Sequence, residues 1–375
     1  MKRPTVYDVA EHAGVSTATV SRTLQNPQNV RASNRERVLA AVNELGYVPS
    51  GSARGLATSR TGVLGLFLPE FDAIVDLHDL DISPVNPRVQ IMRDRNALQD
   101  DKSSILYFDE VLRGSELEAW RSGFSLMVGI GREYSPRELE SVLTNISGQV
   151  DGLIVVSRMI PEETLHLIAR RIPVVVVAEE RHGDEFDHVS VSNRAGMKAL
   201  VEHLFDEHGI HDPVYMAGPS DSPDDAERRS GFIEALHHKG VNPYSLPMLS
   251  GEFSRERARS IALDLIARQA LPRALVCAND QMALGVLDVF NAEGIRVPED
   301  VIVTGFDGIR ESNASRPRLT TVKQPMLDLG RAAVRLLVSR LVEGDSWPRP
   351  QEVVLPVTVL LRDTCEGQEI DRVRS

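Results

Sequence analysis

Cysteine and long apolar runs are what this 375-residue sequence has least of. Only Cys277 and Cys365 occur, at a spacing that matches no metal or redox motif, so the sequence predicts two structural thiols in a reducing compartment. The longest apolar run, residues 172–178, has the length of a buried strand, whereas a bilayer span needs roughly 20 residues. No apolar stretch follows the basic N-terminus, which argues against a signal peptide. The protein is therefore expected in the cytoplasm, without a membrane partner.

The motifs of common enzyme classes are also missing. The sequence contains neither a Gly-x-Ser-x-Gly nucleophile elbow nor a phosphate-binding loop that ends in Gly-Lys-Ser/Thr. Gly129 and Gly131 follow a predicted strand, but Tyr134 stands where a dinucleotide fingerprint needs its third glycine. These absences favour a binding protein over an enzyme, and no cofactor is expected.

Three histidines, His203, His208 and His211, lie near Glu202 and Asp206 in the sequence. Their spacing matches no ligand pattern of a structural zinc site. They are therefore expected to be solvated side chains at the end of a helix, and no metal ion is predicted.

The charge is distributed unevenly along the chain, whose formal net charge is −12. Residues 1–60 carry eight basic and four acidic side chains, a net charge of +4, which leaves −16 on the rest. Contacts to phosphates need local positive charge rather than a basic whole protein, so this pattern suits a DNA-binding head on an acidic body. Charge alone does not distinguish that interpretation from a chance asymmetry. The length predicts two to three domains.

Three short helices are predicted between residues 5 and 46. Residues 5–8 (TVYD) form a capping-box pattern before the first helix, Ser16 is expected to cap the second, and Ser33 with Glu36 predicts a capping box for the third. Gly14 permits a tight turn between the first two helices. Two short helices that join at a glycine and are braced by a third form a helix-turn-helix. The apolar residues at helical spacing are Val6, Val9, Ala10, Ala13, Val20, Leu24, Val38, Val42 and Leu45.

In such a motif the second helix, residues 16–24, enters the major groove of DNA. Arg22 is the best candidate base reader, because a guanidinium group can donate two hydrogen bonds to guanine O6 and N7. Thr17 and Ala18 are small and suit thymine methyl groups, although a solvated helix start would look the same. The side chains expected to donate to phosphates are Thr5, Tyr7, Ser16, Thr19, Ser21 and Asn29.

The head resembles the LacI/GalR family of transcriptional regulators in residues 5–10 (TVYDVA), 13–16 (AGVS), 19–22 (TVSR) and 45–49 (LGYVP). The resemblance extends over nearly the whole chain. It implies a homodimeric regulator, most simply a repressor, which binds double-stranded, pseudo-palindromic operator DNA and associates with the nucleoid when bound.

The residues after Pro49 resemble the hinge helix of this family. The resemblance implies that Leu56 wedges into a central base step of the minor groove and that Ala53 also contacts DNA. Gly51 and Gly55 make the segment a poor helix by itself, so it could fold only on DNA. Composition alone would equally describe a flexible linker.

From residue 61 onward, apolar strands alternate with helical stretches. The predicted strands are residues 63–68, 125–129, 152–156, 174–178, 214–216, 274–277 and 301–304. Such alternation predicts α/β architecture with parallel sheets that are covered by helices on both faces. The family resemblance implies two lobes like those of a periplasmic sugar-binding protein, with a ligand between them. Body segments that match the family are 193–196 (NRAG), 218–219 (GP), 228–232 (RRSGF), 278–285 (ANDQMALG), 305–307 (GFD) and 319–325 (LTTVKQP).

These patterns predict where each domain begins and ends. The chain is expected to cross between the lobes near residues 190, 324 and 352. The expected parts are a head at 1–48, a hinge at 49–60, a first lobe from 61–190 with 324–352, a second lobe from 191–323 with 353–364, and a polar tail at 365–375. Because the tail lacks leucine heptads, a dimer is expected rather than a helical tetramer.

The expected effector site combines a carboxylate, an arginine and an aromatic ring, which suit the hydroxyl groups and ring of a sugar or a nucleobase. By resemblance Arg228 binds the effector and Phe253 stacks on it, while Asp280 is expected to point into the cleft. Structural roles in an ion pair, a cap or the core remain alternatives for these three. A sugar-like effector is favoured over a purine-like corepressor, and a global regulator with a protein co-effector is a further alternative. The candidate effector-binding residues are Phe71, Asp72, Arg228, Phe253, Asp280 and Gln324.

An insertion at about residues 72–105 interrupts the family pattern between the first body strand and its helix. It carries seven aspartates against three arginines and one lysine. A segment of this length within a lobe is unusual, so our hypothesis is a lid or partner surface beside the ligand site, with surface decoration as the alternative. Deletion of residues 73–104 is then expected to change effector affinity, and unchanged affinity and induction would argue for decoration.

Overall fold

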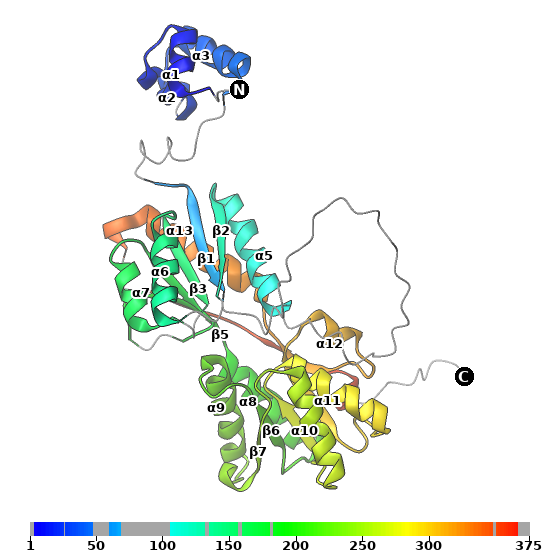
Figure 1. Ribbon diagram of the computed structural model, residues 1–375. Helices are drawn as coiled ribbons and strands as arrows, with labels where there is room; N and C mark the ends of the chain where they lie inside the picture. Colours follow the sequence, from blue (N-terminus) through cyan, green and yellow to red (C-terminus); the bar gives the residue numbers. More distant parts are fainter. Residues whose placement is uncertain are drawn as a thin grey trace, which may run out of the picture. The chain divides into compact units, whose positions relative to one another are not determined.

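The computed structural model describes residues 4–25, 27–47, 60–68, 106–131, 135–156, 160–180, 183–347 and 350–366. The chain divides into two compact units, Met1–Gly62 and Val63–Ser375 (Figure 1). The predicted hinge residues Ala53 and Leu56, the effector candidates Phe71 and Asp72, and the insertion at 72–105 lie outside the described residues. In the part of the chain that is described, no helix is long and apolar enough to cross a membrane.

The head is a helical unit, as predicted. Its elements are α1 (Val6–Ala13), α2 (Thr17–Gln25), the 3₁₀ turn η1 (Pro27–Asn29) and α3 (Ala32–Leu45). The Thr5 capping box is confirmed, and the Ser16 hydroxyl accepts a hydrogen bond from the Thr19 amide at 3.2 Å. Gly14 adopts φ +60° between α1 and α2, a left-handed conformation that glycine adopts without steric cost.

The predicted capping box of Ser33 and Glu36 is wrong. Helix α3 already begins at Ala32, and Arg31 is the N-cap residue without a side-chain hydrogen bond to the helix, so Ser33 lies inside the first turn. The Arg37 guanidinium instead donates to the Gly14 carbonyl at 3.1 Å, which ties α3 to the turn between α1 and α2. The small core of the head consists of Val9, Ala10, Ala13, Val20, Val38, Ala41 and Tyr47.

The first lobe of the body is built on a six-stranded parallel sheet. Its order is β11-β5-β4-β3-β1-β2. Alternate residues of β1 serve opposite faces, because Leu64 and Leu66 belong to the larger apolar core while Phe67 packs into a second cluster with Leu143. The strands are β1 (Val63–Leu68), β2 (Ser125–Ile130), β3 (Gly152–Val156), β4 (Val174–Val177), β5 (Asp187–Val191) and β11 (Glu352–Leu355). The helices are α5 (Leu106–Arg121), α6 (Pro136–Ser147), α7 (Glu162–Ala169) and α13 (Met326–Glu343), followed by η3 (Gly344–Ser346).

Helices α5 and α13 pack closely against each other (Figure 1). Gly114 faces the backbone of Leu327 and Gly330 faces that of Val111, so a side chain at either glycine would collide with main-chain atoms. The Glu118 carboxylate accepts hydrogen bonds from two arginines of α13, Arg331 at 3.1 Å and Arg335 at 2.8 Å. The hydrogen bond from Arg335 is the main reason that the pKa of Glu118 lies below its ordinary value.

The second lobe has a similar six-stranded sheet with the order β12-β10-β9-β8-β6-β7, in which only β12 runs antiparallel to its neighbour. Helices α8 and α9 pack together, as do α10 and α11 (Figure 1). The strands are β6 (Val214–Ala217), β7 (Met248–Ser250), β8 (Ala274–Cys277), β9 (Ile302–Asp307), β10 (Thr320–Lys323) and β12 (Thr358–Leu360). The helices are α8 (Asn193–His208), α9 (Pro223–His238), η2 (Pro243–Ser245), α10 (Arg255–Ala267), α11 (Asp280–Glu293), α12 (Arg310–Ala314) and α14 (Asp363–Glu366).

All seven predicted strands are present, and the α/β class is confirmed. Two boundaries differ from the prediction. Strand β11 pairs with β5 from Glu352 to Leu355, so the chain leaves the first sheet after Leu355 rather than near residue 352. The pairing ends there because the next residue, Pro356, has no backbone amide hydrogen to continue the ladder. The predicted polar tail begins too early, because Cys365 is buried and lies with Glu366 in α14.

Candidate functional sites

Helix α2 presents an exposed face on the head. Ala18 and Arg22, four residues apart and so on one side of the helix, are both exposed, while Thr17 is partly buried. Arg22 makes no hydrogen bond or ion pair with the described residues, so its guanidinium donors are available. Of the three predicted base-reading residues, Ala18 and Arg22 are therefore exposed, and the contacts of all three to DNA remain a prediction.

The predicted phosphate-contacting residues fall into two groups. Thr5, Tyr7, Ser16 and Asn29 are exposed, and the Tyr7 side chain is 73% exposed. Thr19 and Ser21 are partly buried, and the hydroxyl of Thr19 lies 2.9 Å from that of Ser16. Thr5 and Ser16 already cap helices of the head. Hydrogen bonds from these two residues to DNA phosphates would therefore add to a structural role.

In the body, Arg228 of α9 forms the centre of a polar cluster. Its side chain is only 3% exposed, and its guanidinium carbon lies 4.0 Å from the centre of the Phe306 ring. Its Nε donates to Asn193 Oδ1 at 2.9 Å, and its Nη1 donates to the carbonyl of Ala278 at 2.7 Å. The remaining nitrogen, Nη2, lies 3.9 Å from Asp224 Oδ2, beyond hydrogen-bond distance, so this edge of the guanidinium could still donate to a ligand.

Two carboxylates flank this arginine. Asp307 Oδ1 lies 3.3 Å from Arg228 Nη1, and Asp224 Oδ2 lies 3.9 Å from Nη2. Burial lowers the pKa of Arg228, but the charges of Asp307 and Asp224 outweigh it and leave the pKa above its ordinary value. The guanidinium therefore stays charged in a buried setting. An arginine between carboxylates can donate to a ligand oxygen while the carboxylates accept from hydroxyl groups.

Gln324 lies at the chain's crossing between the lobes and contacts the same cluster. Its amide nitrogen donates to Asp307 Oδ1 at 2.7 Å, and its backbone amide donates to the Asp307 carbonyl at 3.0 Å. Its buried Oε1 has no partner among the described residues. Burial raises the pKa of Asp307 above its ordinary value, although Arg228 and the hydrogen bond from Gln324 act in the opposite direction.

Tyr107, in the first turn of α5, belongs to the first lobe and lies within electrostatic range of the charges in this cluster. Its hydroxyl is buried and makes no hydrogen bond within the described part of the chain. Burial, with the charges of Asp224 and Asp307 nearby, raises the pKa of Tyr107 well above its ordinary value, so the hydroxyl stays a donor. A buried, unpaired hydroxyl is costly, which points to a partner such as a ligand or ordered water.

Phe253 lies near Arg228 with the backbone in a left-handed conformation. Its ring centre is 5.9 Å from the guanidinium carbon, and its φ is +58°. Asp307, in the same cluster, also has a positive φ, +114°. Such conformations cost free energy, and they occur preferentially at ligand sites.

The structure places Asp280 differently from the expectation that it points into the cleft. Its side chain is fully buried, with Oδ1 accepting from the Thr321 hydroxyl at 2.6 Å and Oδ2 from the Ile309 amide at 2.9 Å. Burial, together with the charge of Asp307, raises the pKa of Asp280. The carboxylate thus joins α11 to the segment after β9, and a role toward an effector remains a prediction.

Arg228 thus lies near Phe253 and beside Asp307, which Gln324 also contacts, whereas the other predicted residues either lie outside the described residues or face elsewhere. Sequence reasoning missed Tyr107, Asn193, Asp224 and Asp307 as site residues. Asp307 and Asn193 stand at the carboxyl ends of strands, where ligands bind in α/β folds, so position alone could have singled them out. Asp224 lies in the first turn of α9.

Comparison with known proteins agrees with this architecture. A model of the lacI family of bacterial regulatory proteins matches residues 5–50, and a model of a periplasmic binding protein-like domain matches residues 201–365. Catabolite control protein A of Priestia megaterium is 29% identical over 335 residues, which cover 89% of this chain and 91% of that protein.

Two solved structures cover nearly the whole chain. A lac repressor dimer bound to operator and the anti-inducer ONPF has a TM-score of 0.78 and 26% identity, covering 97% of this chain and 99% of that one. A complex of the transcriptional regulator CelR with cellobiose has a TM-score of 0.65 and 27% identity, covering 96% of this chain and 100% of that one.

Proposed function

The chain belongs to the LacI family of DNA-binding transcriptional repressors, and from this premise we propose that a small polyhydroxyl molecule, such as a sugar, binds around Arg228 and controls operator binding. The observation that carries the proposal is the set of buried, unpaired polar groups at this cluster. The Tyr107 hydroxyl can donate and Gln324 Oε1 can accept, and neither has a hydrogen-bond partner among the described residues. The Arg228 guanidinium, whose Nη2 lies 3.9 Å from Asp224 Oδ2, adds a charged donor. Together with two carboxylates these groups suit a ligand rich in hydroxyls.

Control by such a ligand requires that it prefers one arrangement of the lobes. Tyr107 comes from the first lobe, while Arg228 and Asp307 come from the second, so a ligand that bonds all three favours the arrangement in which they converge. The cellobiose bound to the related regulator CelR supports a sugar-like effector. A purine-like corepressor would also find donors and acceptors here, whereas a protein co-effector would leave these buried groups unpaired.

A thermal-shift screen of the full-length protein tests this proposal. Mono- and disaccharides, nucleosides and purine bases are added separately, and binding to the folded state raises the midpoint by mass action. We expect a sugar among the hits, and we expect that hit to change operator affinity in a fluorescence-anisotropy assay. A stabilising purine without any stabilising sugar would favour the corepressor alternative. Stabilisation by none of the compounds would favour a protein co-effector.

We further propose that the protein acts as a homodimer through the first lobe. Leu117 and Trp120 lie three residues apart on α5 and are 49% and 81% exposed. Val128 and Ile130 of the neighbouring edge strand β2 are 41% and 43% exposed. Gly129 between them faces the α6 side, so these two side chains project toward the α5 side of the sheet. We call these four residues the apolar patch; a second copy of the chain would bury it.

The substitution Trp120→Lys is expected to raise the dissociation constant of the dimer about tenfold, since tryptophans often contribute much of the binding energy of an interface. Sedimentation equilibrium or mass photometry over a range of concentrations measures the change. The matched control is Tyr244→Lys, because Tyr244 is 86% exposed in the second lobe, away from the apolar patch. Equal effects of the two substitutions, or no effect of Trp120→Lys, would place the dimer interface elsewhere.

A further inference from the structure

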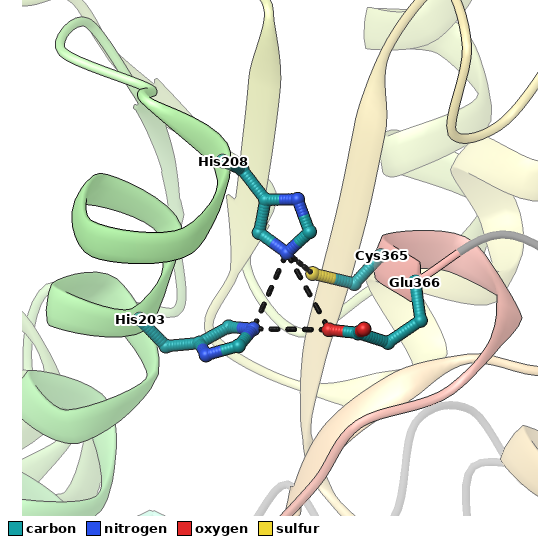
Figure 2. A group of neighbouring side chains, drawn as sticks. All are labelled: His203, His208, Cys365 and Glu366. Carbon is teal, nitrogen blue, oxygen red and sulfur yellow. Dashed lines mark hydrogen bonds and ion pairs between the residues drawn. The ribbon is translucent and has the colours of Figure 1, made fainter.

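Four side chains with metal-binding atoms converge at the end of the second lobe, away from the Arg228 cluster. Figure 2 shows His203 and His208 from the last turns of α8, and Cys365 and Glu366 from α14. One atom from each side chain lies within 4.8 Å of the corresponding atom of every other. The histidines were expected to be solvated, but their side chains are only 19% and 20% exposed.

The distances among these atoms are close to those of a tetrahedral zinc site. His208 Nε2 lies 3.3 Å from His203 Nε2, 3.1 Å from Cys365 Sγ and 3.5 Å from Glu366 Oε1. His203 Nε2 lies 3.2 Å from the same carboxylate oxygen. Zinc bonds of about 2.0–2.3 Å to nitrogen, oxygen and sulfur place tetrahedral ligands roughly 3.3–3.8 Å apart. Only small movements are therefore needed to close four ligands around one ion.

The donor set favours zinc over the hard cations. Two imidazole nitrogens, one thiolate and one carboxylate suit Zn²⁺, whereas Mg²⁺ and Ca²⁺ prefer oxygen ligands throughout. Both histidines direct the same ring atom, Nε2, at the other three groups. A divalent cation would satisfy all four lone pairs at once.

The segment that carries Cys365 and Glu366 is held in place by bonds outside the cluster. The Arg318 guanidinium donates to Asp363 at 2.8 Å, the Thr320 amide donates to the Thr364 hydroxyl at 2.8 Å, and the Thr364 amide donates to the Arg318 carbonyl at 3.0 Å. On the other side, Leu204 is fully buried and anchors α8 to the core. The two pairs of ligands are thus presented by fixed elements, which lowers the cost of ordering them around an ion.

We propose that His203, His208, Cys365 and Glu366 form a structural Zn²⁺ site. The ion joins the first helix of the second lobe to its last, α8 to α14. Cys365 binds as the thiolate and releases its proton to solvent, and the four protein ligands close the coordination sphere. Because the four ligands converge only in the folded lobe, Zn²⁺ binds the folded state in preference to the unfolded chain and is expected to stabilise the lobe.

The test uses the full-length protein without a histidine tag, stripped with a chelator and titrated with Zn²⁺ against a chromophoric competitor. We expect one tight Zn²⁺ per chain and a melting midpoint that rises by several degrees with Zn²⁺. Cys365→Ala and His203→Gln are expected to weaken binding by about tenfold or more. The matched control is His237→Gln, which changes an exposed histidine at the end of α9 and is expected to bind like the wild type.

Substitution of Co²⁺ for Zn²⁺ gives a spectroscopic test of the metal–thiolate bond, which a change in protein stability alone cannot produce. Co²⁺ in the wild-type protein is expected to show a thiolate-to-metal charge-transfer band, which Cys365→Ala removes and His237→Gln keeps. If Cys365→Ala fails to fold, His203→Gln still tests the site. The His203 side chain lies at the partly exposed edge of the cluster, so its replacement is expected to leave the fold intact. Absence of a stoichiometric tight site in the wild type, or wild-type affinity in both ligand variants, would overturn the proposal. Operator binding is not a readout here, so the proposed regulatory function can fail or succeed independently.

Discussion

Replacing Arg22 with alanine is expected to remove most of the protein's preference for its operator. A bidentate arginine–guanine pair contributes about 1–3 kcal/mol of discrimination, or roughly 5- to 150-fold per half-site. A homodimer on two half-sites loses this twice, so specific affinity is expected to fall by roughly 30-fold to more than 10,000-fold. The measurement is selection of preferred sequences from a random DNA pool, followed by titration of the selected site with wild type and variant at one fixed salt concentration.

The matched control for that experiment is Arg31→Ala. Arg31 is an exposed arginine at the start of α3 and makes no side-chain cap, so its loss removes one positive charge without breaking a helix end. It is expected to weaken binding to all sequences similarly, as the loss of a phosphate contact does, and to keep the sequence preference. If Arg22→Ala retained the same selected sequence with the same discrimination, base reading would have to come from other residues of the head.

An Arg228→Lys variant is expected to bind operator DNA normally yet to need about 100-fold more effector for the same response. Lysine keeps the positive charge beside Asp307 and Asp224, but it cannot supply the guanidinium edge to a ligand. Loss of charge-assisted hydrogen bonds of about 1.5–3 kcal/mol each accounts for an effect of this size. The measurement is effector titration of a preformed protein–operator complex by fluorescence anisotropy.

Arg229→Lys is the control for Arg228→Lys, because the adjacent arginine on α9 is changed in the same way. It is expected to leave the effector response unchanged. A lysine variant at Arg228 with wild-type effector sensitivity would show that the effector is held elsewhere in the body. Loss of operator binding in the absence of effector would instead show that Arg228 stabilises the DNA-binding arrangement.

The sequence predicts most of the fold because its local signals are strong. Residues such as Leu64 and Val175 lie in uninterrupted apolar runs that only a buried parallel strand explains, and Thr5 with Asp8 marks a helix start without reference to the rest of the fold. The strands that were missed are short or polar: β5 contains Asp187 and His188, and β12 spans three residues at a sheet edge. Their existence depends on neighbours that the local pattern does not specify.

The candidate sites are harder to predict for the same reason. Arg228 lies in a recognisable segment, but its partners Tyr107 and Asp307 are distant in sequence. Asp280 has the residue type and position of a ligand-binding carboxylate, and only the fold shows that its oxygens already bond Thr321 and Ile309. His208 and Cys365 are separated by 157 positions, so no spacing rule brings them together.

Helix α5 carries Tyr107 near one end and Trp120 near the other, about 20 Å apart at 1.5 Å per residue. Its close packing on α13, through Gly114, Gly330 and Glu118, leaves it little freedom to bend between those ends. If one end responds to the effector and the other to a second subunit, the two events are thermodynamically linked and each alters the other by the same factor. The apparent affinity for the effector is then expected to depend on protein concentration, and Trp120→Lys is expected to shift that dependence to about tenfold higher protein concentration.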